Sequence, residues 1–234
     1  MKRYENEEVQ ALVRPVEGPY LDAAYHLDRT PVEITVGMGE DWAPLACKEV
    51  YGKGVKTALE RKAASCVFDL TPAARLGEAG IFAALEGIYG GAYRQKFALT
   101  GTCQPELTCY AVGEGWTDGE LELATVLARN ILQVRNLVNR PPNLLTPALF
   151  AQALEEMADG LPVQVQVLGQ KELEARGLNA LLAVGTGSGN DPCLILLRYT
   201  GAPDNGERLG LVGKGVTCDT GGYCLKPAKS MEGM

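Results

Sequence analysis

Two lysines and one aspartate lie in a glycine-rich stretch near the end of the sequence, and these residue types could do chemistry together. Lys214, Asp219 and Lys226 are spaced five and then seven residues apart, and the stretch from 213 to 226 contains four glycines. Glycines permit positive φ angles and a close approach of the backbone, so such a loop can wrap a small ion or a bound group. The alternative is an ordinary surface loop whose lysines are solvated.

A short apolar run, Leu209–Val212, comes directly before this loop and predicts a buried strand. Binding sites in open α/β sheets gather beyond the carboxyl ends of strands. We therefore expect the loop to leave a sheet at the end where such sites form.

The loop resembles the signature of the leucyl aminopeptidases, the M17 family of two-metal peptidases. It reads Val212-Gly-Lys-Gly-Val-Thr-Cys-Asp-Thr-Gly-Gly-Tyr-Cys-Leu-Lys-Pro227 where the family reads approximately V-G-K-G-[IVL]-T-F-D-[ST]-G-G-x-[SN]-[IL]-K-P. Asn139-Arg-Pro-Pro-Asn-Leu-Leu-Thr-Pro147 is similar to the family's N-x-P-x-N-x-x-T-P. The segment 183–201 is similar to its V-G-x-G-S…P-x-[LI]-[IV]…Y-x-G. The resemblance covers about residues 118–234 well and the first hundred loosely.

This resemblance implies a hydrolase that removes N-terminal amino acids from peptides with a free N-terminus. By analogy, Asp219 would bind or bridge two divalent metal ions, Mn or Zn with Mg as a further candidate. Lys214 would bind one ion through its neutral amine. Lys226 would stay protonated and polarise the scissile carbonyl or stabilise the oxyanion. The metals would activate a water and anchor the substrate's α-amine. The sequence identifies no general base.

The loop also departs from the family pattern. Cys218 replaces the phenylalanine before the aspartate, and Tyr223-Cys224 replaces a pair that is usually small. Both cysteines could contact a metal, but we expect them to pack. The sequence given ends a few residues before the family's M-K-x-D-M motif and lacks its N-T-D-A-E-G-R block, which carries further ligands and the catalytic arginine.

We therefore expect the N-terminal portion of a leucyl aminopeptidase, truncated within its catalytic domain and inactive by itself. Two alternatives remain. One is a non-catalytic binding or oligomerisation subunit, and the other is a half-enzyme that needs a separate C-terminal partner. The family resemblance also implies a homo-oligomer, a hexamer.

Composition excludes several other classes. A net charge of −7 argues against nucleic-acid binding, which depends on clustered Lys and Arg. No stretch approaches the ~20 apolar residues of a membrane span, so we expect no membrane association. The first residues lack the apolar core of a secretion signal, and seven cysteines without a C-x-x-C pair fit reduced thiols; both observations favour the cytoplasm. Because His26 is the one histidine, carboxylates must provide most metal ligands.

Alternating strand and helix patterns predict an α/β protein. We expect a small, macro-like N-terminal domain over residues 1–116, a linker helix over 117–140, and an incomplete mixed-sheet peptidase domain over 141–234. A core helix within one continuous domain is the alternative for 117–140. The helical pattern over 42–62 is expected to break at Gly52 and Gly54, and the run Ala180–Val184 is predicted to be a strand.

Overall fold

A computed structural model describes residues 1–5, 7–94, 107–201, 206 and 208–231 of the chain. The chain forms two compact units, unit 1 (Met1–Asn136) and unit 2 (Leu137–Met234). The division falls inside a long helix, and the domain limits inferred from the sequence, 1–116, 117–140 and 141–234, stay a prediction.

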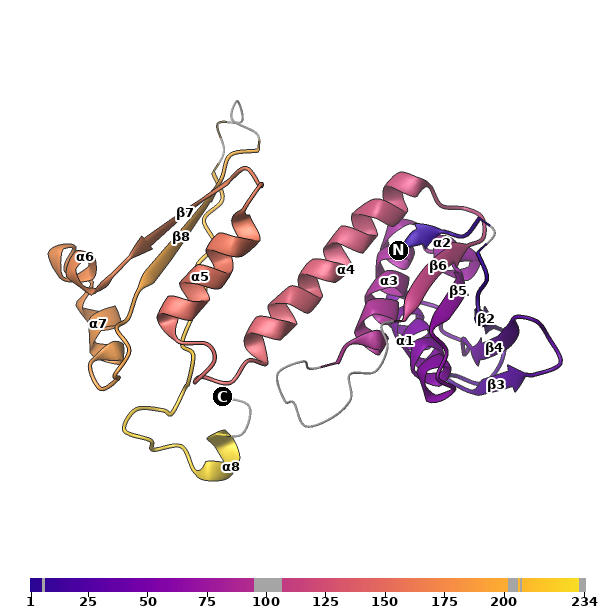
Figure 1. The fold of residues 1–234 in the computed structure, drawn as a ribbon, viewed down its shortest axis with the longest axis horizontal. Helices are drawn as coiled ribbons and strands as arrows, with labels where there is room; N and C mark the ends of the chain where they lie inside the picture. Colours follow the sequence, from indigo (N-terminus) through magenta and orange to yellow (C-terminus); the bar gives the residue numbers. More distant parts are fainter. Residues whose placement is uncertain (6, 95–106, 202–205, 207, 232–234) are drawn as a thin grey trace. The chain divides into compact units, whose positions relative to one another are not determined.

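Unit 1 contains a six-stranded sheet in the order β1-β6-β5-β2-β4-β3. All neighbouring strands in it are parallel except β3, which pairs antiparallel with β4 at the edge (Figure 1). Its strands are β1 (Lys2–Arg3), β2 (Ala11–Val16), β3 (Ala23–His26), β4 (Val32–Gly37), β5 (Ser65–Asp69) and β6 (Thr108–Val112). The sheet is therefore mixed, and it lies in unit 1, whereas the mixed sheet was expected over 141–234.

The strands form where β-branched residues alternate with polar ones. In β2, Ala11 and Val13 are buried and face the helices, whereas Arg14 points to the other face and remains half-buried. The register pairs Val13 with Ile34 of β4 and with Phe68 of β5, so the buried side chains of three parallel strands lie in one row. This row forms the base of the hydrophobic core of unit 1.

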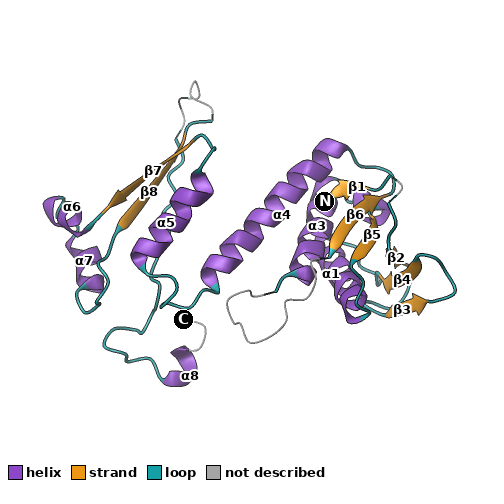
Figure 2. Cartoon of the chain, viewed as in Figure 1, coloured by secondary structure: helices purple, strands orange, loops and turns teal. Residues whose placement is uncertain are grey.

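One helix packs on these strands and a second helix packs against the first (Figures 1 and 2). They are α1 (Pro44–Glu60) and α3 (Glu78–Ala92), and the single-turn helix α2 (Thr71–Ala74) lies between them in the sequence. The predicted break at Gly52 and Gly54 is wrong, because α1 is continuous. Gly54 faces Val13 and Gly52 faces Gly87 of α3, so both glycines are used for close packing rather than for a turn.

Helix α4 (Asp118–Val138) follows β6 and agrees with the helix predicted over 117–140. Its hydroxyl cap is provided by Thr117, whose Oγ accepts a hydrogen bond from the Glu120 amide. Leu121, Ala124 and Ala128 on one side of α4 join the core of unit 1.

Unit 2 is built around a two-stranded antiparallel sheet. Its elements are α5 (Pro147–Ala158), β7 (Val163–Leu168), α6 (Gln170–Ala175), α7 (Asn179–Gly185), β8 (Leu194–Tyr199) and α8 (Ala228–Met231). Thr146 caps α5 by accepting a hydrogen bond from the Leu149 amide, and Pro147 occupies the first turn. Leu168 and Leu173 are fully buried and are the largest fully buried side chains of this unit.

Two strands predicted in unit 2 are wrong. Residues Ala180–Val184 lie in helix α7. The run consists of alanine, leucine and valine, and a short apolar run with good helix formers does not distinguish helix from strand. The run Leu209–Val212 has no regular secondary structure, and Leu209, Leu211 and Val212 are almost fully exposed. An isolated apolar run becomes a strand only when a neighbour pairs with it, and no described strand does so.

The predicted α/β class is confirmed, with a mixed sheet, a long helix and a second α/β unit. Within the described ranges, no helix is both long and apolar enough to cross a membrane.

Candidate functional site

The loop 211–227 brings the three predicted site residues together. The Asp219 carboxylate accepts a hydrogen bond from the Lys214 amine at 2.6 Å, and the Lys226 amine lies 3.1 Å from the same oxygen, Oδ2. Lys226 and Asp219 are the more enclosed members, with about 27% and 31% of their side chains exposed, against 69% for Lys214. One carboxylate is thus held between two amines.

A left-handed turn positions Lys226. Four consecutive residues, Gly221–Cys224, have positive φ angles, from 52° at Tyr223 to 82° at Gly222. Two backbone hydrogen bonds close the turn. The Leu225 amide donates to the Gly222 carbonyl, and the Lys226 amide donates to the Thr220 carbonyl at 3.0 Å. The backbone therefore returns toward Asp219 immediately before Lys226.

Glycine is required at the start of this turn for two reasons. Gly221 has φ of 75°, which side chains other than glycine rarely adopt. A Cβ atom on Gly221 would also lie 2.9 Å from Cγ of Lys226. In addition, the Gly221 amide donates to Oδ1 of Asp219 at 3.1 Å. Sequence reasoning treated this glycine only as flexible, although the Asp-x-Gly spacing is a signal for such a side-chain-to-backbone turn.

The three donors favour the ionised form of the carboxylate. The hydrogen bond from Lys214 is the largest cause that lowers the pKa of Asp219 well below its usual value, followed by the bonds from Lys226 and from the Gly221 amide. Asp219 is therefore ionised at neutral pH and can act as an anionic oxygen ligand.

Asp219 and Lys214 fit a divalent ion only in part. Their donor atoms are 2.6 Å apart, close enough for both to approach one ion after the lysine has lost its proton. A protein site for such an ion normally has four to six ligands, and in the described ranges no group of three or more His, Cys, Asp or Glu could hold one. These two residues could therefore provide part of a metal centre, but the described residues do not complete one.

The remaining candidates contribute less. Cys218 and Cys224 are exposed free thiols in the loop, so the packing role expected for them is wrong here; no described neighbour encloses them. His26 lies at the end of β3 with its Nε2 3.2 Å from Oγ1 of Thr35, a local contact distant in sequence from the loop.

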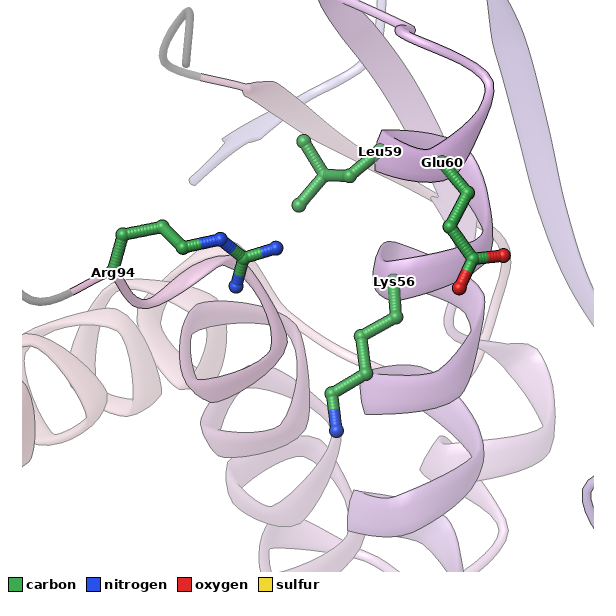
Figure 3. Close-up of a pocket in the computed structure, with 4 residues that line it drawn as sticks. All are labelled: Lys56, Leu59, Glu60 and Arg94. Carbon is green, nitrogen blue, oxygen red and sulfur yellow. The ribbon is translucent and has the colours of Figure 1, made fainter. Parts of the chain in front are cut away.

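Unit 1 contains an open depression that includes none of the predicted site residues. Lys56, Leu59 and Glu60 of α1 line one side, and Arg94 lines the other, with its guanidinium directed toward Leu59 (Figure 3). Arg94 already donates to the Tyr93 carbonyl at 3.0 Å, and Glu60 offsets one of the two cations. We assign no role to this depression.

Comparison with known proteins identifies the region around the loop. Residues 132–234 match the model of the cytosol aminopeptidase family, catalytic domain. A "Probable cytosol aminopeptidase" of Brucella anthropi is 44% identical over 113 residues, which are 48% of this chain and 22% of that protein. A protein of the same name from Nocardia farcinica is 36% identical over 170 residues, 69% of this chain and 33% of that protein.

Solved structures agree over nearly the whole chain at the level of fold. The leucyl aminopeptidase of Trypanosoma cruzi superposes with a TM-score of 0.79 at 20% identity, covering 97% of this chain and 52% of that one. The bottromycin maturation enzyme BotP, solved in complex with Mn, also gives 0.79, at 23% identity over 96% of this chain and 52% of that one. The chain thus spans about half the length of these structures and a third or less of the two curated relatives in the aligned regions.

Proposed function

Because this chain belongs, through residues 132–234, to the cytosol aminopeptidase family of hydrolases, we propose that the loop 211–227 forms part of a metal-dependent leucyl aminopeptidase site. The observation that carries this proposal is the position of one ionised carboxylate, Asp219, between Lys214 and Lys226. The turn that holds both lysines on one oxygen favours this proposal over a surface loop with solvated lysines.

Each residue then has a distinct role. Asp219 offers an ionised oxygen, and Lys214 offers its amine once the proton has left. Lys226 keeps its proton and, held beside Asp219 by the turn, presents a cation to a peptide carbonyl. Bound divalent ions would supply Lewis acidity and a position for the free α-amine of a peptide. Mn is the first candidate, since BotP was solved with it, and Zn and Mg are the alternatives.

Activity requires ligands beyond the two that the described residues supply. We propose that these come from further carboxylates of the complete enzyme, so that the present residues act as one half of the site. The substrates would be peptides with a free N-terminus. The assembly would be a homo-oligomer, by family analogy a hexamer. The compartment would be the cytoplasm, since the relatives are named cytosol aminopeptidases.

A chimaeric enzyme tests whether this loop can work. Residues 132–234 would replace the matching segment of the Brucella anthropi relative, and hydrolysis of leucine amide would be measured with excess Mn²⁺. We expect the chimaera to hydrolyse leucine amide, and Asp219→Ala or Lys226→Ala to reduce kcat by about 100-fold or more. Lys229→Ala, which removes a neighbouring exposed lysine, should leave the rate unchanged.

The chain by itself provides the second arm. It should show no hydrolysis above background, because its described residues offer too few ligands. The chain alone could hydrolyse leucine amide and lose that activity in both Asp219→Ala and Lys226→Ala. This result would contradict the proposal that these residues form only one half of the site. An inactive chimaera beside an active relative would contradict a catalytic role for the loop.

A further inference from the structure

The Asp219 carboxylate has little acceptor capacity left for a further cation. An ionised carboxylate offers about four lone-pair positions, roughly two on each oxygen. Oδ2 accepts hydrogen bonds from the amines of Lys214 at 2.6 Å and Lys226 at 3.1 Å, and Oδ1 accepts one from the Gly221 amide at 3.1 Å. Both positions on Oδ2 are therefore taken by these donors.

The place of Lys214 decides which oxygen an ion would use. In the site proposed above, one divalent ion is shared by Asp219 and the Lys214 amine, and that amine lies beside Oδ2. An ion held by both residues must therefore approach Oδ2. The Lys226 ammonium lies 3.1 Å from this same oxygen, and its positive charge repels a second cation there. The ion and the Lys226 ammonium thus exclude each other at Oδ2.

The charged end of Lys226 can move while its backbone stays in place. The Lys226 amide donates to the Thr220 carbonyl at 3.0 Å, and Cγ of Lys226 lies only 2.9 Å from where a Cβ on Gly221 would be. Beyond Cγ, the ammonium ends a flexible stem, and 27% of the side chain is exposed. The turn therefore fixes the start of this side chain and leaves its charged end exchangeable.

We propose that Lys226 competes with divalent ions for Oδ2 of Asp219, so that its ammonium must leave this oxygen before Asp219 and Lys214 can share an ion. This inference rests on the proposed function, because it takes Asp219 and Lys214 as metal ligands. Lys226 then has two successive partners, first the carboxylate of Asp219 and afterwards the carbonyl of a peptide. The loop carries its own counter-ion, and this counter-ion weakens the binding of metal.

Binding of Mn²⁺ to the whole chain tests this competition without a measurement of activity. The electron paramagnetic resonance signal of free Mn²⁺ gives a dissociation constant for each variant. Lys226→Met keeps Cγ and the backbone amide but removes the charge, and we expect it to bind Mn²⁺ about tenfold or more tightly than wild type. Lys226→Arg keeps a cation and should bind no more tightly than wild type.

Lys229→Met is the matched control, because it removes one positive charge from an exposed lysine three residues further along the chain. It should change the dissociation constant by less than about twofold, since solvent screens exposed charges. Circular dichroism should show that all variants are folded. Lys226→Met that binds Mn²⁺ no more tightly than wild type, including no binding by either, would overturn the competition and leave the proposed function to the chimaera.

The double variant Lys226→Met/Asp219→Ala shows where the ion binds. We expect it to lose the tighter binding of Lys226→Met, because the competition takes place on the Asp219 carboxylate. A double variant that binds Mn²⁺ as tightly as Lys226→Met would place the ion elsewhere. That result would overturn the competition and would also contradict the proposed function, since Asp219 would then not be a metal ligand.

Discussion

A Cβ atom on Gly87 of α3 would lie 2.1 Å from the main-chain carbonyl oxygen of Lys48 on α1. The two helices therefore touch through their backbones, and one turn further on, a Cβ on Gly91 would lie 2.8 Å from the Gly52 carbonyl. The charged ends of the same turn also pair, with Nζ of Lys48 2.5 Å from Oε1 of Glu86. Through this close approach the two helices together cover the core of unit 1.

Gly87→Ala should consequently destabilise unit 1. The new methyl group meets backbone rather than a flexible side chain, so the helices must separate. Overpacking of this kind costs about 1–3 kcal/mol, more than the gain in helix propensity of about 1 kcal/mol. Urea unfolding followed by circular dichroism would show a lower midpoint.

Gly90→Ala, three residues along the same helix, is the control. The nearest atom to its new Cβ is a guanidinium nitrogen of Arg135 at 3.8 Å, an ordinary contact. We expect it to be neutral or to stabilise by up to about 1 kcal/mol. A Gly87→Ala variant as stable as Gly90→Ala would show that the helices are not in backbone contact.

The same glycines show where sequence reasoning is limited. The pattern of α4 extends over 21 residues and predicts that helix within two residues at each end, because a long period-3.6 pattern has no competing interpretation. Gly52 and Gly54 were interpreted as breaks, since the sequence does not show that a second helix will pack against them. For Leu209–Val212, the apolar run was visible, but strand formation depends on a partner that the run does not specify.

For the candidate site too, one part could be predicted from the sequence and another could not. The spacing of Lys214, Asp219 and Lys226 agrees with a family pattern, and the structure brings these three together. The backbone that does so could not be read from the sequence, because Tyr223 and Cys224 are unusual residues for positive φ. The amide of Gly221 was likewise missed, since a backbone donor has no side chain to recognise.

Glu33 should contribute most to stability among the charged residues of the sheet. Its carboxylate is buried and contacts Arg14 at 3.0 Å and also Arg29. Glu33→Gln would leave Arg29 without this anion and Arg14 with Asp69 alone, 3.4 Å away, and we expect a loss of about 1–3 kcal/mol in the free energy of unfolding. The exposed pair of Arg3 and Asp118 is the comparison, and Asp118→Asn should cost about 0.5 kcal/mol or less. Equal costs would show that burial adds nothing to the Glu33 network.

Alkaline pH should weaken the fold through two buried thiols. Burial raises the pKa of Cys47 and of Cys66 from 9.0 to about 12. Above pH 9 the unfolded chain loses these protons while the folded chain keeps them, so their contribution to stability is complete below pH 9 and declines toward pH 12. Each thiol should account for about 1 kcal/mol per pH unit between 9 and 11. In Cys66→Ala the urea midpoint should therefore fall less steeply with pH than in the wild type. Cys218→Ala, at an exposed thiol, should leave the slope unchanged. Identical slopes of the urea midpoint against pH in the two variants would rule the effect out.

Acid pH should act on Asp219 with the opposite sign. Because Lys214, Lys226 and the Gly221 amide lower the pKa of Asp219, the pairing is complete above the usual aspartate value and is lost as the pH falls through the lowered one. At about pH 3.9, where a free aspartate is half protonated, the carboxyl ¹³C chemical shift of labelled Asp219 should still be that of the ionised form. Lys214→Met should raise the midpoint more than Lys226→Met, since Lys214 makes the largest contribution, and Lys229→Met should leave it unchanged. A wild-type midpoint at the ordinary value, or equal effects of all three substitutions, would mean that the two lysines do not hold this carboxylate in solution.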